Sequence, residues 1–122
     1  MSINLHDIDN EKIVLQSADA VKLEFRIPAS SDFFDGHFPE YKLLPAVAQF
    51  EIVTRFSKKY FGTQRYVPHI HRIKFSAPIR PDTTVVLCLE RNQQKGTVTY
   101  SLADKKKAEK IYSSGTFAVV MQ

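Results

Sequence analysis

The stretch PAVAQFEIVTRFSKKYFG, residues 45–62, decides the fold. Proline is favoured in the first turn of a helix, and glycine is favoured just after a helix ends. Lys58 and Lys59 then fall in the last turn, where positive charge suits the helix dipole. These signals predict one helix of about four turns over 46–61. Its first half is apolar nearly all round, so we expect it to be covered on more than one side.

Extended segments precede and follow this helix. Before it, 12–17 and 20–27 are separated by a short polar break, and the second alternates apolar and polar residues, as a hairpin strand does. After the helix come four segments rich in β-branched and aromatic residues, separated by polar turns: 67–79, 84–91, 96–102 and 108–120. Because strands and helices do not alternate, the order predicts an α+β fold in which an antiparallel sheet packs on one helix.

The length and composition limit the class of protein. With 122 residues, 43% of them hydrophobic, the chain suits a single domain over 1–122. No apolar run is long enough to cross a bilayer and the N-terminus does not resemble a signal peptide, so we expect a cytoplasmic protein without membrane insertion. The single cysteine, Cys88, lies in an apolar run, which predicts a buried thiol. His69 and His71 lack a convincing third ligand, so we expect no metal site.

The net charge of +4, from 17 basic and 13 acidic residues, indicates an acidic partner. Nucleic acid, an anionic membrane and an acidic protein all fit that charge. The aromatic residues follow the pattern of a core and not of an exposed stacking platform, so we expect no nucleic-acid binding. The lysines at 105–107 are interpreted as a plain turn between two strands.

The segment FFDGHFPEYKLLPAVAQFE, residues 33–51, carries the chemistry. His37 lies in an irregular loop, and Glu51 follows fourteen residues later inside the predicted helix. A histidine and a carboxylate can serve as general base and general acid, and the helix start at Ala46 offers unpaired backbone N–H groups. On spacing alone, however, His37 is more often an ordinary surface or hydrogen-bonded histidine, and a solvated, salt-bridged side chain beside Arg55 is the default for Glu51.

These residues resemble the 3-hydroxyacyl-ACP dehydratases of the hotdog fold over about 20–120. The matching residues are Gly36-His37-Phe38-Pro39, then Leu43-Leu44-Pro45-Ala46-Val47, then Glu51; a later match runs from His71 to Asp82. The sequence of residues 43–49 is similar to that of dehydratases of aryl polyene pathways. The resemblance implies one long central helix wrapped by an antiparallel sheet of about five to six strands.

The resemblance also implies an activity, namely dehydration of a 3-hydroxyacyl thioester to the trans-2-enoyl thioester in fatty acid or polyene-type biosynthesis. His37 would remove the C2 proton, the Ala46 N–H would bind the developing oxyanion, and Glu51 of the neighbouring subunit would protonate the leaving hydroxyl. The acyl chain would ride on the phosphopantetheine of acyl carrier protein, with no other cofactor. Its binding residues would be Phe34, Gly36, Phe38, Pro39, Leu43, Leu44 and Val47.

The implied partners are acyl carrier protein and a second hotdog subunit. The assembly would be a homodimer, a larger even-numbered oligomer, or a heterodimer with a related subunit. The basic residues expected to receive the carrier are Lys58, Lys59, Arg72, Lys74 and Arg80, with Arg91 as a further candidate.

Two departures from the family pattern keep other functions open. Ala46 replaces a glycine of the family, and Arg55 replaces a glutamine. They favour a non-catalytic hotdog protein that binds acyl carriers or pairs with an active subunit. A hotdog thioesterase is the third alternative.

Overall fold

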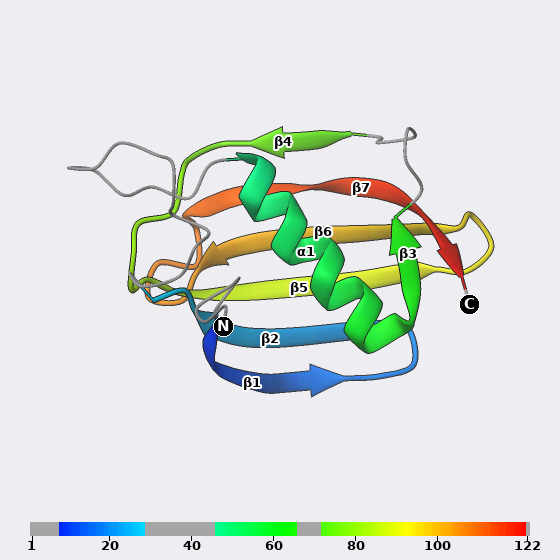
Figure 1. The fold of residues 1–122 in the computed structure, drawn as a ribbon, viewed down its shortest axis with the longest axis horizontal. Helices are drawn as coiled ribbons and strands as arrows, with labels where there is room; N and C mark the ends of the chain where they lie inside the picture. The colour runs from blue at the N-terminus through cyan, green and yellow to red at the C-terminus, as the bar shows by residue number, and fades with distance from the viewer. Residues whose placement is uncertain (1–7, 29–45, 66–71, 122) are drawn as a thin grey trace, which may run out of the picture.

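The computed structural model describes residues 8–28, 46–65 and 72–121. Within them, helix α1 crosses one face of an antiparallel sheet diagonally (Figure 1). The elements in chain order are β1 (Asp9–Gln16), β2 (Ala20–Arg26), α1 (Ala46–Phe61), β3 (Thr63–Arg65), β4 (Ile73–Phe75), β5 (Thr84–Asn92), β6 (Thr97–Asp104) and β7 (Ile111–Met121). The predicted α+β class is confirmed, and the helix has the predicted bounds.

The strands form one seven-stranded sheet in the order β1-β2-β5-β6-β7-β3, with β4 also paired to β7. All of these pairings are antiparallel. The predicted hairpin is β1 and β2, and the predicted meander is β5, β6 and β7. As a result β1 lies at one edge of the sheet, whereas β3 and β4 lie at the other.

Two short strands differ from the prediction. Strand β3 was not expected, because a three-residue strand is defined by its pairing with the end of β7 and has no sequence pattern of its own. The expected strand over 67–79 is shorter in its described part, where β4 ends at Phe75. The backbone N–H groups of Ser76 and Ala77 then both donate to the Tyr112 carbonyl, at 2.8 and 3.2 Å, which interrupts the regular ladder.

The core fills the space between α1 and the sheet. The helix contributes Phe50, Ile52, Val53 and Phe56, all buried, and the sheet contributes alternate residues of its strands. Aromatic rings join the two layers: the centroids of Phe25 and Phe56 lie 4.9 Å apart, and those of Phe50 and Phe117 lie 5.2 Å apart. These four helix residues therefore form the face that packs on the sheet.

Cys88 is not the buried thiol that its apolar surroundings predict. In β5 the side chains of Val85, Leu87 and Leu89 are fully buried, whereas Cys88 is only half-buried. Successive side chains of a strand point to opposite faces, so Cys88 lies on the face away from the helix, opposite Lys22 of β2. The apolar run concealed this alternation.

Strands β4 and β7 approach each other closely at Gly115. This residue has φ of +156°, and a Cβ atom there would lie 2.1 Å from the Arg72 carbonyl oxygen and 2.8 Å from Ile73 Cα. The same Arg72 carbonyl accepts a hydrogen bond from the Thr116 N–H at 3.0 Å. Glycine is therefore required where β4 joins the sheet.

The helix connects two ends of the sheet, which we call the helix-start end and the helix-finish end. At the helix-start end, Gln49 Nε2 donates to the Ala77 carbonyl at 2.8 Å, and Ala77 in turn bonds Tyr112 near the beginning of β7. At the helix-finish end, Arg91 near the end of β5 donates to the Phe61 carbonyl at 3.3 Å. Within the described ranges, no helix is long and apolar enough to span a membrane.

Candidate active site

The start of α1 is the centre of the candidate site. Ala46 is the first helical residue, and the first four N–H groups of a helix have no partner within the helix. Gln49, 1% exposed, fixes this turn against Ala77 through its hydrogen bond. The helix start is thus a fixed group of backbone donors at the positive end of the helix dipole, which suits a developing negative charge.

Glu51 lies just over one turn further along the same helix. It is exposed, whereas its neighbours Phe50 and Ile52 are buried, so its side chain lies on the helix face turned away from the sheet. Arg55 follows four residues later on the same face and is also exposed. A carboxylate on this face is accessible to a second molecule that covers the helix.

The other predicted members of the site lie outside the described residues. They are the proposed base His37 and the predicted acyl-binding residues Phe34, Gly36, Phe38, Pro39, Leu43 and Leu44. Val47 belongs to the first turn of α1. The structure therefore describes the helix half of the candidate site: the Ala46 backbone, the Val47 position and the Glu51 side chain.

The small cavity beside the helix start, about 240 Å³, is lined by Gln49, Phe75, Ser76, Ala77 and Pro78. Phe75 is 41% exposed at the sheet edge. An aromatic side chain that is accessible beside the N–H groups without a partner inside the helix suits an acyl chain whose thioester lies at those groups. Sequence reasoning had not assigned these five residues to the site; Phe75 followed by Pro78 was part of the resemblance, but it carried no role there.

Two buried hydroxyl groups lie in the core, and one of them is opposite Phe75 of this cavity. Ser113 is opposite Phe75 in the β4–β7 pairing and is fully buried, and Tyr100 is 2% exposed. Neither hydroxyl oxygen has a hydrogen-bond partner of normal geometry within the described residues. Burial raises the pKa of Tyr100, and the nearby Ser113 hydroxyl offsets part of that rise. The interior behind the cavity is therefore partly polar.

The basic residues predicted to receive a carrier are exposed but do not form one patch. Lys59 lies in the last turn of α1 and donates to Glu11 of β1 at 2.6 Å. Arg72 and Lys74 accompany β4, at the opposite edge of the sheet. Lys58 lies beside Lys59 in that last turn, roughly 18 Å along the axis from the first helical residue at 1.5 Å per residue. Arg80 lies between β4 and β5.

The last turn of α1 is tied to β1 through Glu11. The Glu11 carboxylate accepts hydrogen bonds from Lys59 and from the Tyr60 hydroxyl. Partial burial raises the pKa of Glu11, but these two hydrogen bonds and the positive charges of Lys59 and Arg55 outweigh it and leave the pKa lowered. Burial, together with the Glu11 carboxylate, raises the pKa of Tyr60 to about 12. Lys59 is therefore part of the fold's own contacts.

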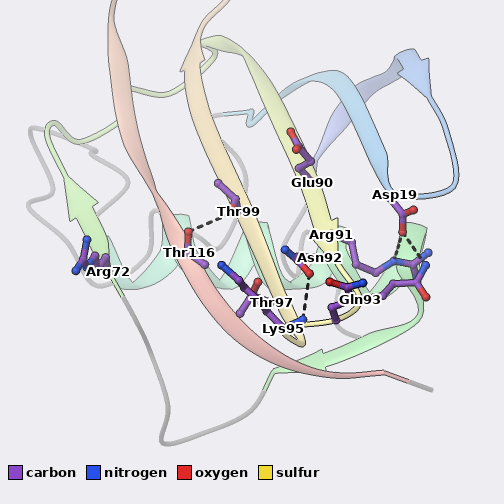
Figure 2. Close-up of a pocket in the computed structure, with 11 residues that line it drawn as sticks. Asp19, Arg72, Glu90, Arg91, Asn92, Gln93, Lys95, Thr97, Thr99 and Thr116 are labelled. Atoms are coloured by element: carbon purple, nitrogen blue, oxygen red, sulfur yellow. Dashed lines mark hydrogen bonds and ion pairs between the residues drawn. The ribbon is translucent and has the colours of Figure 1, made fainter.

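A second concave surface, about 730 Å³, lies at the helix-finish end and is polar (Figure 2). It contains Arg91, whose Nε donates to Asp19 at 3.0 Å, and the Thr99–Thr116 hydroxyl pair at 3.0 Å. Thr99 and Thr116 alternate with the buried Tyr100 and Phe117, so these two residues lie on the sheet face away from α1, whereas Arg91 contacts Phe61, the last residue of the helix. This concave surface therefore lies apart from Ala46 and Glu51.

Comparison with known proteins gives the same fold and a family. The model of the ApeI-like family, described as ApeI dehydratase, matches residues 13–116. The 3-hydroxyacyl-(acyl-carrier-protein) dehydratase FabZ of Streptococcus mutans is 26% identical over 113 residues, covering 87% of this chain and 81% of that protein.

Solved structures agree with this match. The dehydratase heterocomplex ApeI:P from Xenorhabdus doucetiae has a TM-score of 0.74 at 22% identity, covering 91% of this chain and 98% of that one. A hypothetical thioesterase from Streptococcus pneumoniae, solved with coenzyme A, has a TM-score of 0.67 at 12% identity, covering 93% and 87%. The hotdog fold and the dehydratase resemblance predicted from the sequence are confirmed.

Proposed function

The chain belongs to the ApeI-like dehydratase family, and we propose that it dehydrates a 3-hydroxyacyl thioester on acyl carrier protein to the trans-2-enoyl thioester. The observation that carries this proposal is the family match over 13–116, which includes both His37 and Glu51. The described start of α1 supports it, because Ala46 opens the helix and Glu51 lies exposed on it.

In the proposed reaction, His37 removes a proton from C2 of the acyl chain. The electron pair moves toward the thioester carbonyl, whose oxygen accepts a hydrogen bond from the Ala46 N–H. The C2–C3 double bond then forms as the C3–OH bond breaks, and Glu51 donates the proton that makes the leaving hydroxyl a water molecule. The two side chains exchange protons with solvent before the next turnover.

A second subunit completes this proposal. Glu51 lies on the helix face turned away from its own sheet, so a carboxylate there can reach a substrate held by His37 of a neighbouring chain. The assembly is a homodimer, a larger even-numbered oligomer or a heterodimer. The solved ApeI:P protein, which this chain resembles in fold, is described as a heterocomplex. Light scattering of the purified chain, alone and with a candidate partner, distinguishes these assemblies.

We extend the proposal to the substrate class. The residues at 43–49 are similar to those of aryl polyene dehydratases, so we propose an acyl chain of the polyene type as an alternative to a saturated fatty acyl chain. The exposed Phe75 beside the helix start is an aromatic surface suited to a conjugated chain. Relative kcat/KM for saturated and conjugated substrates decides between the two.

The test uses His37→Ala and Glu51→Gln, with Glu90→Gln as the matched control because Glu90 is exposed on β5. Mass spectrometry follows the interconversion of 3-hydroxyacyl and enoyl carrier from both sides. We expect each active-site variant to lose about 10²- to 10⁴-fold in turnover, while the control stays within about twofold. Retained activity in His37→Ala or Glu51→Gln contradicts the assigned roles.

The second candidate function is a non-catalytic subunit that binds acyl carriers or supports an active partner. Ala46 and Arg55 favour it, because both replace residues of the family pattern. In that case the pure chain binds the carrier without turnover, and dehydration appears only after a partner is added. Release of free thiol from the same substrates instead supports the thioesterase alternative.

A further inference from the structure

The turn between β6 and β7 concentrates the chain's excess positive charge. Residues 104–110 read DKKKAEK, in which four lysines against two acids give a net charge of +2 out of +4 for the whole chain. Residues 105–110 are all exposed. Half of the net charge therefore lies on one short loop.

The loop is held in shape by the carboxylate of Asp104. One of its oxygens accepts the N–H groups of Lys106 at 2.8 Å and Lys107 at 3.0 Å, and the other accepts the Tyr112 hydroxyl at 2.8 Å. The backbone N–H of Asp104 donates to the Lys110 carbonyl at 2.9 Å and closes the turn. Little backbone freedom therefore remains to be lost when a partner binds this loop.

The four lysines differ in what their ammonium groups contact. Lys105 Nζ donates to Glu24 at 2.7 Å, and Lys110 Nζ lies 5.4 Å from the centroid of the Tyr112 ring. Within the described residues, Lys106 and Lys107 make no ion pair or ring contact through their side chains. These two charges are available to another molecule.

The turn lies at the helix-start end of the sheet (Figure 1). The Lys105 N–H donates to the Thr84 carbonyl at the beginning of β5. Tyr112, which follows the turn, accepts the backbone hydrogen bond of Ala77, and Ala77 in turn binds Gln49 in the first turns of α1. A molecule bound at the turn therefore lies at the same end as the helix N–H groups.

We propose that Lys106 and Lys107 form a docking point for an acidic acyl carrier protein that delivers its thioester to the start of α1. The inference rests on the proposed function and assigns the carrier to residues other than the dispersed cations predicted from the sequence. Ile111, 42% exposed, adds an apolar contact beside the charges. The turn itself holds no aromatic residue on which bases could stack, which favours a protein over a nucleic acid.

The test compares Lys107→Glu and Lys106→Glu/Lys107→Glu with Lys95→Glu. Lys95 is exposed in the β5–β6 turn at the helix-finish end, so it matches the single variant in charge change and in local structure. Two substrates are used: a 3-hydroxyacyl group on acyl carrier protein, and the same group on pantetheine. The dissociation constant of the loaded carrier is measured separately at low and at moderate salt, and thermal midpoints confirm folding.

We expect the double variant to raise KM for the carrier-linked substrate roughly tenfold, with kcat and the pantetheine reaction within about twofold of the parent. Its carrier affinity should also lose most of its dependence on salt, because the interaction is electrostatic. Lys107→Glu should show part of the same change, and Lys95→Glu should show none.

An equal rise in KM for Lys95→Glu overturns the inference, because net charge alone then explains the effect. It is also overturned if the double variant binds the carrier normally but loses binding to an oligonucleotide or to anionic vesicles. The failure of the proposed function is separate: the parent then binds the carrier but leaves both thioesters unchanged.

Discussion

The two ends of the sheet both carry basic residues, yet use them differently. At the helix-finish end, Arg91 donates to Asp19, to the Ala18 carbonyl at 2.7 Å and to the Phe61 carbonyl at 3.3 Å, and it lies over the Phe61 ring. At the helix-start end, Lys106 and Lys107 project from a turn that is already closed by other hydrogen bonds.

The number of cations at each end therefore does not show where a partner binds. The sequence offers Arg91 as a further candidate for binding an acidic partner, but Arg91 pairs with Asp19, 72 residues away in the chain, and the pair joins β5 to the β1–β2 turn. The sequence indicates only a turn at Lys106 and Lys107. Long-range contacts decide which charges stabilise the fold and which remain for a ligand.

The largest effect on stability is expected where β4 pairs with β7. Gly115→Ala places a methyl group 2.1 Å from the Arg72 carbonyl oxygen, so β4 must move away from β7. We expect the free energy of unfolding to fall by about 3 kcal/mol, measured by urea denaturation. The neighbouring Ser114→Ala serves as the control. If both variants unfold at the same urea concentration, β4 does not pack against Gly115 as closely as the structure describes.

The next prediction compares Arg91 at the helix-finish end with Lys107 at the helix-start end. Arg91→Ala removes hydrogen bonds to two main-chain carbonyls and the contact with Phe61, so we expect a loss of about 2 kcal/mol in stability. The carrier KM should remain that of the parent. Lys107→Ala should behave in the opposite way, with unchanged stability and weaker carrier binding. The opposite pair of results would mean that Arg91 binds the carrier and Lys107 stabilises the fold.

Acid should weaken the contact between β1 and the last turn of α1. The pKa of Glu11 in the folded protein is below its ordinary value of 4.5, so its stabilising effect is complete above pH 4.5 and disappears as the pH falls through the lowered value. Glu11→Gln should reduce stability at neutral pH and flatten the dependence below pH 4.5. Thermal midpoints from pH 7 to pH 3 measure both; parallel curves for parent and variant would contradict the assignment.

The smallest effect on stability is expected at alkaline pH. It involves two tyrosine–carboxylate hydrogen bonds, Tyr60 with Glu11 and Tyr112 with Asp104. Burial and a nearby carboxylate raise the pKa of Tyr60, beside Glu11, and of Tyr112, beside Asp104, to about 12. Because the protonated form is favoured by folding, this stabilisation is complete below pH 10 and is lost as the pH rises toward 12. Ultraviolet titration measures the tyrosine hydroxyls directly. In each of the variants Tyr60→Phe and Tyr112→Phe, one tyrosine that titrates near pH 12 should be missing.

The sequence predicted α1 closely because the signals for its ends are local. Pro45 and Gly62 flank the helix, and Gly62 has φ of +68°, which suits the residue after a helix. Strand β3 and the outward direction of Cys88 were missed, since both depend on pairing with distant strands. The local sequence pattern therefore predicted where the helix and the longer strands lie better than it predicted which side chains face the core.

The candidate site divides in the same way. The resemblance assigned Ala46 and Glu51, and the structure places them at the start and on the exposed face of α1. The cavity at Gln49 and Phe75 could not be predicted, because β4 reaches the helix only through the folded sheet. Lys106 was undervalued for a related reason: its neighbour Lys105 is paired with Glu24, 81 residues earlier in the chain.

Strand β1 has a consequence for how the chain behaves in concentrated solution. It is an edge strand, and its Ile13, Val14 and Leu15 are 45%, 41% and 66% exposed. A regular apolar edge of this kind is a template for aggregation. The pairing of β1 with β2, however, is irregular between Asp9 and Lys12 and again between Ile13 and Leu15. These breaks distort the edge, so a second chain cannot extend the sheet in continuous register.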